Sequence, residues 1–128
     1  MKDIMELCDI VRETGFAIHR YHRNGHVEKI YHNALVNRLR KQGLDAKSEF
    51  PIQVFDEDGT LLGDFKADLL IENRLVVEIK AVRAILDEHV AQILGYLRSS
   101  RMEHGLLVNF GAPKYSIKKY ILNDAYLS

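Results

Sequence analysis

Asp68, Glu78 and Lys80 are the residues of this chain whose types and spacing could do chemistry. Two apolar runs flank Glu72-Asn73-Arg74, and a three-residue turn there would pair the runs as a β-hairpin with Asp68 opposite Glu78. Because side chains alternate along a strand, both acids and the lysine would share one face. Acids directly opposed on paired strands, with Cβ atoms about 4.5–5.5 Å apart, repel each other, and a divalent metal together with Lys80 would offset that repulsion.

An ordinary pair of solvated carboxylates beside a lysine would give the same pattern. A slip of one residue in the hairpin register would also move every side chain to the other face. The spacing alone therefore leaves the metal site and the solvated pair as two open interpretations. Both faces of the hairpin are otherwise apolar, so we expect other elements to cover each side of it.

The elements that must position these residues follow from hydrophobic periodicity. Helical spacing predicts helices over residues 3–20, 26–42 and 87–100, the second with Glu28 in its first turn and Gly43 as its C-cap. Alternating or buried apolar runs predict strands over residues 46–55, 61–71, 75–80 and 105–110. The segment 115–122 is compatible with either a strand or a helix.

This order of elements predicts an α/β fold with a mixed central sheet flanked by helices. The first three strands follow one another through short turns and should be antiparallel, whereas a helix between two strands makes a crossover connection. We expect residues 1–128 to form a single domain, because a chain of this length buries roughly two-thirds of its unfolded surface in one core.

Composition argues against several classes of protein. No apolar run approaches the roughly 18–20 residues that span a bilayer, and acids near the start argue against a signal peptide. We therefore expect a soluble, cytoplasmic protein with no membrane partner. The single cysteine, Cys8, cannot form an internal disulfide or an iron–sulfur cage, and its apolar neighbours predict that it is buried.

The net charge is zero, but the charges are unevenly distributed. Residues 51–100 hold nine acids against five basic residues, and this acidic excess coincides with the predicted metal site. Basic groups elsewhere could contact phosphates, although groups this small are usually solvated faces: Arg38, Arg40, Lys41, Lys114, Lys118 and Lys119.

Four histidines fall close together in the sequence and invite a zinc interpretation: His19, His22, His26 and His32. The break at residues 23–25 prevents one regular helical face, and no cysteine accompanies the histidines. Zinc is therefore a weak alternative.

The ordered set of elements, with an acid before the hairpin turn and Glu-x-Lys after it, resembles the PD-(D/E)xK nuclease superfamily. The segment Gly25–Tyr31 is similar to the signature of the small bacterial and archaeal GxxExxY family, which belongs to that superfamily, although Arg23-Asn24 replaces its usual Gly-Pro turn. Further similar segments are 67–69, 77–80, 89–97 and 107–110. The resemblance implies a restriction-endonuclease-like core with antiparallel hairpins and a helical crossover to a further strand.

The resemblance also implies a metal site. Asp68, Glu78 and the backbone carbonyl of Ile79 would bind Mg²⁺ or Mn²⁺, which prefer hard oxygen ligands. Glu28 would complete the metal shell directly or through water; alternatively, it is simply an anion well placed near a helix N-terminus. Lys80 would orient or help deprotonate the attacking water and neutralise charge on the phosphate.

Four further residues would contact the substrate under this resemblance. Gln92 and Tyr96 lie one helical turn apart and match the QxxxY motif of related branches, where the pair helps to position the metal site or the nucleic-acid strand. Otherwise, Tyr96 is a core aromatic and Gln92 an exposed helix former. Lys118 and Lys119 would touch the phosphate backbone.

We therefore expect metal-dependent hydrolysis of nucleic acid, with DNA ahead of RNA as substrate. The alternative is a non-cleaving module that keeps the metal and binds nucleic acid or a protein. A third hypothesis is a structural domain whose acids are incidental. A homodimer and a protein partner both remain open from the sequence.

Overall fold

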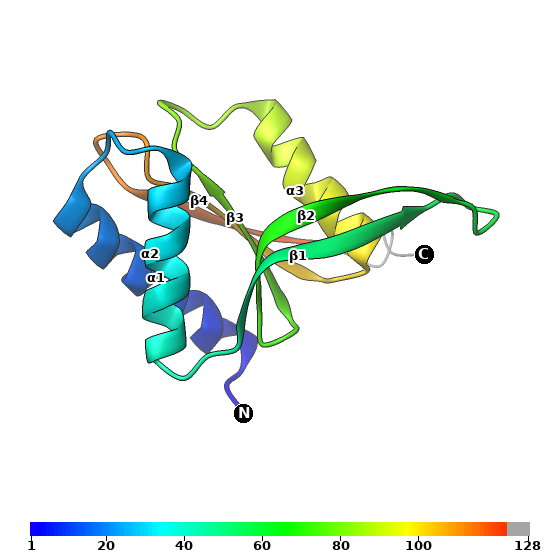
Figure 1. The fold of residues 1–128 in the computed structure, drawn as a ribbon, viewed down its shortest axis with the longest axis horizontal. Coiled ribbons are helices and arrows are strands. Elements are labelled where there is room, and N and C mark those ends of the chain that lie inside the picture. Colours follow the sequence, from blue (N-terminus) through cyan, green and yellow to red (C-terminus); the bar gives the residue numbers. More distant parts are fainter. Residues whose placement is uncertain (123–128) are drawn as a thin grey trace.

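The central strand of the sheet is β3, the strand that carries Glu78 and Lys80. In the computed structural model, which describes residues 1–122, five strands form one sheet in the order β1-β2-β3-β4-β5 (Figure 1). These strands are β1 (Ala46–Phe55), β2 (Leu61–Ile71), β3 (Leu75–Lys80), β4 (His104–Asn109) and β5 (Ser116–Ile121). Only the β3–β4 pairing is parallel among them, as the crossover predicts. The mixed α/β sheet is therefore confirmed.

The helices cover the two faces of the sheet unequally. They are α1 (Ile4–His22), α2 (Glu28–Lys41) and α3 (Asp87–Ser100). Helices α1 and α2 pack together on one face, and α3 lies on the other (Figure 1). None of the helices that the structure describes is long and apolar enough to cross a membrane.

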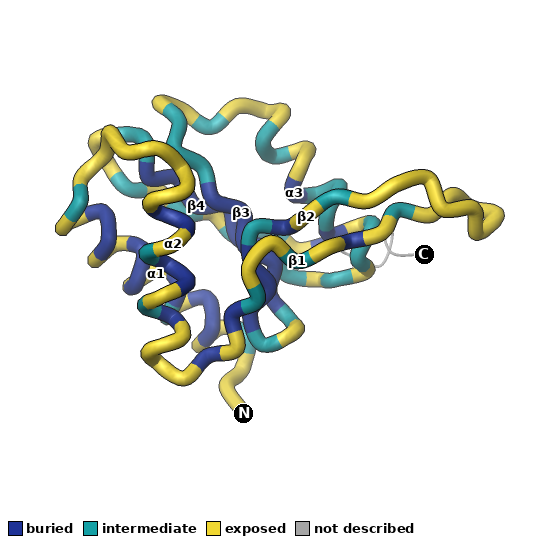
Figure 2. The backbone as a smooth tube through the Cα atoms, in the orientation of Figure 1, coloured by how far each residue is buried: buried dark blue, intermediate teal, exposed yellow. Residues whose placement is uncertain are grey.

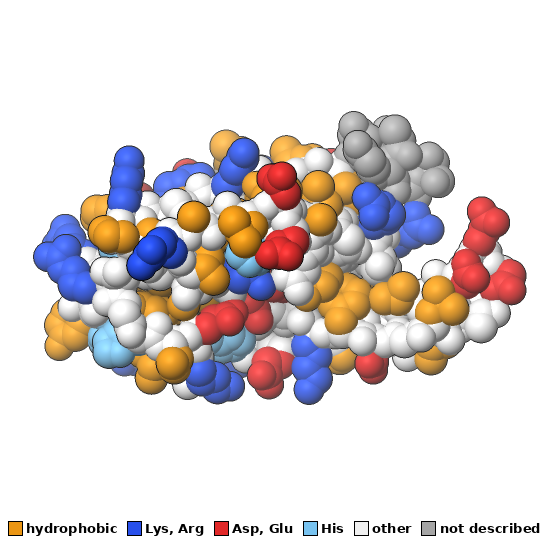
Figure 3. Space-filling view, turned by 90° about the horizontal axis from the view of Figure 1, so that it is seen from above, with side chains coloured by type: hydrophobic (Ala, Val, Ile, Leu, Met, Phe, Trp, Pro, Cys, Tyr) orange, Lys and Arg blue, Asp and Glu red, His pale blue; other side chains and the backbone are white. Residues whose placement is uncertain are grey.

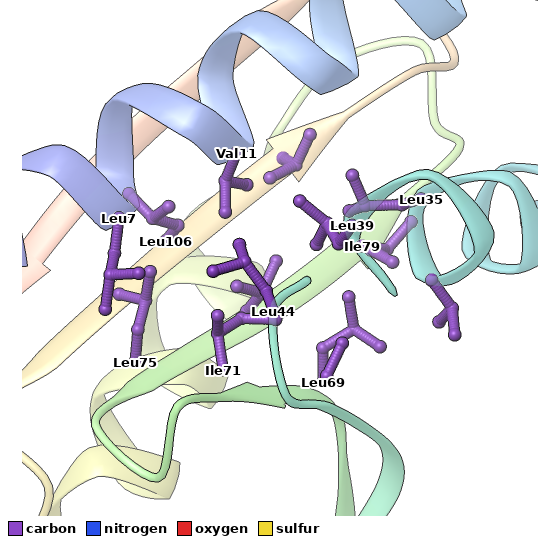
Figure 4. Close-up of a cluster of buried hydrophobic side chains, with 14 of the residues drawn as sticks. Leu7, Val11, Leu35, Leu39, Leu44, Leu69, Ile71, Leu75, Ile79 and Leu106 are labelled. Carbon is purple, nitrogen blue, oxygen red and sulfur yellow. The ribbon is translucent and has the colours of Figure 1, made fainter. Parts of the chain in front are cut away.

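The main core lies between the sheet and the α1–α2 pair (Figure 4). Leucine and valine side chains of both helices meet the residues of β2, β3 and β4 that point to this face, among them Leu69, Val77 and Leu106. A smaller apolar cluster fills the α3 face and includes Leu70, Val76 and Leu97. Alternate residues of β3 therefore serve two separate cores.

The ends of α1 and α2 show why the predicted boundaries shift. The Asp3 carboxylate accepts a hydrogen bond from the Glu6 N–H at 2.8 Å and caps α1. Helix α2 begins at Glu28, two residues later than predicted, because Val27 is extended and Gly25 has a φ of 118°. Cys8 is buried in the main core, as predicted.

The ambiguous segment near the C-terminus is a strand. Residues 116–121 pair antiparallel with the whole of β4, which itself begins at His104, one residue earlier than predicted. The strand is defined by its pairing with β4, the preceding element, and the periodicity of the segment alone could not resolve it.

The β1–β2 hairpin extends beyond the rest of the sheet (Figure 1). Its turn closes where the Asp56 N–H donates to the Thr60 carbonyl at 2.8 Å, with Gly59 at a φ of 89°. Figure 2 shows that the tube is exposed along this extension and buried where the hairpin joins the sheet. The short turn predicted between the first two strands is thus confirmed, and Asp68 of β2 lies at the buried end of the hairpin.

Candidate functional site

A fork between β2 and β3 holds the two acids. The backbone ladder runs only from Ile71↔Leu75 to Leu69↔Val77, and beyond it the strands are joined by side chains. The Asp68 N–H donates to Glu78 Oε1 at 3.1 Å, and the Ile79 N–H donates to Asp68 Oδ2 at 2.7 Å. Each acid therefore satisfies a backbone donor near the other acid, and the two carboxylates are fixed beside each other.

This arrangement agrees with the predicted register of the hairpin. The three ladder pairs are the ones that a three-residue turn predicts, and they set Asp68 across from Glu78. The difference is that the ladder ends at Leu69↔Val77, although both strands continue past this pair. On the other side of β2, the pairing with β1 omits both Asp68 and Glu49, which has a φ of 53°. Asp68 thus lies where regular pairing is interrupted on both sides.

Glu78 is as buried as a core residue, at 3% exposure. Burial first, and then the negative charge of Asp68, raise the pKa of Glu78 to about 9. Asp68 is half-buried, which opens one side of the pair to solvent. The fork therefore concentrates negative charge that a cation would stabilise.

Lys80 lies next to the pair but is held by helix α3. Its Nζ donates to Gln92 Oε1 at 2.8 Å, and its backbone carbonyl accepts from the Phe110 N–H at 2.9 Å. Gln92 thus directs the ammonium group. Tyr96, one turn further along, stacks on Phe65 with ring centroids 4.1 Å apart. Burial, followed by the charges of Glu78 and Asp68, raises the pKa of Tyr96 to about 12.

Glu28 approaches the pair from the first turn of α2. Partial burial, and then the charge of Asp68, raise the pKa of Glu28, while Lys80 opposes the rise. This coupling brings Glu28 into the electrostatic field of the fork. Glu28 is therefore within electrostatic reach of Asp68 and Lys80, but within residues 1–122 it does not complete a cluster of three acids with Asp68 and Glu78.

Two residues near the fork were not assigned to this site from the sequence. His32 is buried one turn after Glu28, and its Nε2 lies 2.6 Å from Ser48 Oγ on β1. Asn109 ends β4 and ties down the segment after β3: its Oδ1 accepts from the Val82 N–H at 3.1 Å, and its Nδ2 donates to the Val82 carbonyl at 3.0 Å. A buried asparagine at the end of an apolar strand was the available signal.

Lys118 and Lys119 are not brought together at the fork. Neighbouring residues of a strand face opposite sides of the sheet, and Lys119 Nζ lies 3.9 Å from Met5 Sδ on α1. Lys118 pairs with Leu107, which pairs with Glu78, so it lies on the α3 face two strands from the acid. Of these two lysines, only Lys118 lies on the same face of the sheet as the carboxylates.

The histidines have separate structural partners. His19 donates from Nε2 to the Ala112 carbonyl at 2.9 Å, and the rings of His22 and His26 meet edge to face. His89 Nδ1 accepts from the Leu86 N–H at 3.0 Å at the start of α3. The grouping of histidines that the sequence suggested is thus dispersed over several different contacts.

The donor set of the fork fits a hard divalent cation. One oxygen of each carboxylate is fixed by a backbone N–H, and ionisation of the buried Glu78 would be stabilised by a cation. Within residues 1–122, no three His, Cys, Asp or Glu side chains converge as a ready-made cage. The third protein ligand would therefore be a main-chain oxygen, as expected of Ile79, or Glu28 acting through water.

Comparisons with known proteins agree with this fold. The crystal structure of SSO0001 superposes with a TM-score of 0.62 and 24% sequence identity, covering 77% of this chain and 52% of that one. The present chain thus corresponds to about half the length of SSO0001, and the likeness concerns the fold. No curated protein matches the chain.

A family model identifies the chain more specifically. Residues 5–120 match the model of the PD-(D/E)XK nuclease superfamily, which spans every described helix and strand almost completely. Nucleases of this superfamily generally use divalent metal ions, and their substrates are nucleic acids. The chain belongs to the PD-(D/E)XK nuclease superfamily.

Proposed function

We propose that this chain hydrolyses phosphodiester bonds of nucleic acid, with DNA ahead of RNA as substrate, at the fork of Asp68 and Glu78. The observation that carries the proposal is the reciprocal hydrogen bonding of these two acids, which fixes a pair of enclosed carboxylates next to Lys80. The superfamily suggests metal-dependent cleavage of nucleic acid. The proposal assigns that activity to these residues.

Asp68, Glu78 and the carbonyl of Ile79 would hold Mg²⁺ or Mn²⁺. When bound, the ion lowers the pKa of a water molecule and stabilises charge on the phosphate. Lys80 places a positive charge beside the same phosphate, held in position by Gln92. The ammonium group stabilises the negative charge that develops there and orients the attacking water.

We also propose that the chain belongs to the GxxExxY branch of the superfamily and forms one domain. Three residues of the segment have roles that support this assignment. Gly25 adopts a φ of 118°, which favours glycine. Glu28 lies in the field of the fork. Tyr31 donates to the Arg23 carbonyl at 2.6 Å and stacks on Phe110, with ring centroids 4.8 Å apart.

A cleavage assay tests the proposal. The wild-type protein is incubated in Mg²⁺ and in Mn²⁺ with single-stranded, double-stranded and branched DNA and with RNA. We expect cutting that falls at least about 100-fold in Asp68→Asn, Glu78→Gln and Lys80→Ala. Asp64→Asn, an exposed acid on the same strand, is the matched control and should cut normally.

Two results would contradict the proposal. If no substrate is cut in either metal, the non-cleaving binding module is the better account. If Lys80→Ala cuts as fast as the wild type, the role of the lysine is wrong even though the protein is a nuclease.

A further inference from the structure

A pocket of about 280 Å³ lies between the last turns of α1 and the loop that follows β4. Three cations line it, Arg20, Arg23 and Lys114, and no acid does. All three residues are exposed, and none forms an ion pair with an acid within residues 1–122. Among the residues that the structure describes, the lining of this pocket therefore carries positive charge and no acid.

Arg23 occupies this pocket at a conformational cost. Its φ of 59° and ψ of −175° lie in a region that glycine adopts easily and other residues rarely adopt. The backbone is held there by the Arg23 N–H, which donates to the His19 carbonyl at 2.8 Å, and by Tyr31, which donates to the Arg23 carbonyl. A glycine would relieve the strain, but it would also remove one of the three cations that line the pocket.

The walls of the pocket are built from packed groups. His19 is buried and fixes the loop after β4 through the Ala112 carbonyl. Tyr115 packs against Gly15, where a Cβ would lie 2.8 Å from its ring carbon Cζ. Phe16 meets Tyr115 edge to face at 6.1 Å and leaves 52% of its surface exposed. The cations are thus displayed on a fixed frame beside an exposed aromatic ring.

The same frame connects the pocket to the fork. The Lys80 carbonyl accepts from the Phe110 N–H, the Phe110 ring stacks on Tyr31, and Tyr31 bonds to Arg23. Figure 3 shows Lys and Arg side chains gathered at the end of the molecule where α1 meets α2, and acidic side chains near the centre of the same face. A strand that reaches the acids could therefore continue towards the cations.

We propose that Arg20, Arg23 and Lys114 bind a phosphate group of the nucleic-acid strand whose cleavage is proposed above. Guanidinium and ammonium groups bind phosphate by charge-assisted hydrogen bonds, and they release counterions from the strand. The exposed ring of Phe16 offers a surface on which a neighbouring base stacks. This inference rests on the proposed function, and it assigns strand binding to a side of the sheet away from Lys118.

Binding is measured by fluorescence anisotropy with a labelled single-stranded DNA of 20 nucleotides. The buffer contains EDTA, so that metal-dependent cutting does not occur. We expect Arg20→Ala and Lys114→Ala each to weaken binding roughly five- to tenfold and to lower the salt slope by about one. Arg23→Gly should weaken binding equally while its Tm stays at or above the wild-type value, because glycine accepts the positive φ. Arg23→Lys keeps the charge and should bind within about threefold of wild type.

Lys41→Ala is the matched control. It removes one exposed charge at the far end of α2, about 20 Å along a helix of 14 residues, and should bind like wild type. Each protein is tested with three forms of the strand: one with a 5′-phosphate, one with a 5′-hydroxyl and one closed into a circle. If the pocket variants lose affinity only for the strand with the 5′-phosphate, the pocket binds a terminal phosphate. If they lose affinity equally for all three forms, the pocket binds an internal phosphodiester.

Unchanged binding in all three pocket variants would overturn the inference. So would an equal loss in Lys41→Ala, because affinity would then follow overall charge, and so would a wild-type protein that binds no strand. Cleavage is scored separately: a protein that binds through the pocket but never cuts contradicts only the proposed function. A protein that cuts while its pocket variants bind normally contradicts only this inference.

Discussion

Strand β3 contributes aliphatic side chains to the core on one face of the sheet and acidic and basic side chains to the fork on the other. Towards α1 and α2, β3 presents Val77 and Ile79 to a continuous aliphatic core. Towards α3, it presents Val76 to a smaller core and then Glu78 and Lys80 to the fork. Glu78 is buried to the same degree as the valines, yet it carries a carboxylate.

The contrast between the two faces shows which part of the fold is stabilising and which part is destabilising. Burying an aliphatic side chain contributes roughly 1.5–3 kcal/mol, whereas burying a carboxylate without a cation is unfavourable. Burial, together with the charge of Asp68, accordingly raises the pKa of Glu78. The aliphatic core on the α1–α2 face therefore offsets the unfavourable free energy of burying the acids on the α3 face.

The largest expected effect comes from the stabilising face. Leu35 is fully buried between α2 and the sheet, so Leu35→Ala should lower the free energy of unfolding by about 2–5 kcal/mol. The response of Tm to added Mn²⁺ should survive, because the fork is built on the other face. Urea unfolding measures the free energy, and thermal unfolding with and without Mn²⁺ measures the response of Tm. Loss of the metal response at temperatures where the variant is folded would mean that the faces are not independent.

The next effect, of opposite sign, comes from the fork. The pKa of folded Glu78 lies above its unfolded value, so the metal-free protein should lose stability as the pH rises from about 4.5 to about 9. Glu78→Gln keeps the acceptor for the Asp68 N–H and removes this loss. At pH 7 without metal it should be more stable by on the order of 2–3 kcal/mol, with the gain vanishing near pH 4.5. Thermal unfolding across this range measures the gain, and a destabilised variant at pH 7 would show that the acid is not strained.

The smallest effects compare two helical glycines. Gly15 of α1 packs against Tyr115, and an added Cβ would overlap the tyrosine hydroxyl, so Gly15→Ala should destabilise by about 1–3 kcal/mol. Within residues 1–122, no atom outside the backbone of α3 lies within 4 Å of the position of a Cβ at Gly95, so Gly95→Ala should stabilise by about 0.5–1 kcal/mol. Chemical denaturation ranks the two variants. If both variants changed the free energy of unfolding in the same direction, the contrast between the two helices would be wrong.

Local patterns were enough to predict the hairpin. The turn at residues 72–74 and the apolar alternation on either side fix the pairs from Ile71↔Leu75 to Leu69↔Val77. They therefore also predict that Asp68 and Glu78 meet. Most helix and strand boundaries followed from periodicity in the same way, because each signal lies within one element.

The contacts between elements were not predictable in this way. The bond from Lys80 to Gln92 joins a strand to a helix, and the strand at residues 116–121 depends on pairing with β4. Lys118 and Lys119 were grouped because they are neighbours in sequence, but a strand sends neighbours to opposite faces. The strain at Arg23 carries no sequence signal, because arginine is an ordinary residue at the end of a helix.

The central claim is that Asp68 and Glu78 bind a divalent metal, and isothermal titration of Mn²⁺ and Mg²⁺ tests it most directly. The account predicts saturable binding to the wild-type protein, lost in Asp68→Ala and kept in Asp64→Ala, a control on the same strand. Saturable binding that persists in Asp68→Ala, or a wild type that binds neither ion, would contradict it.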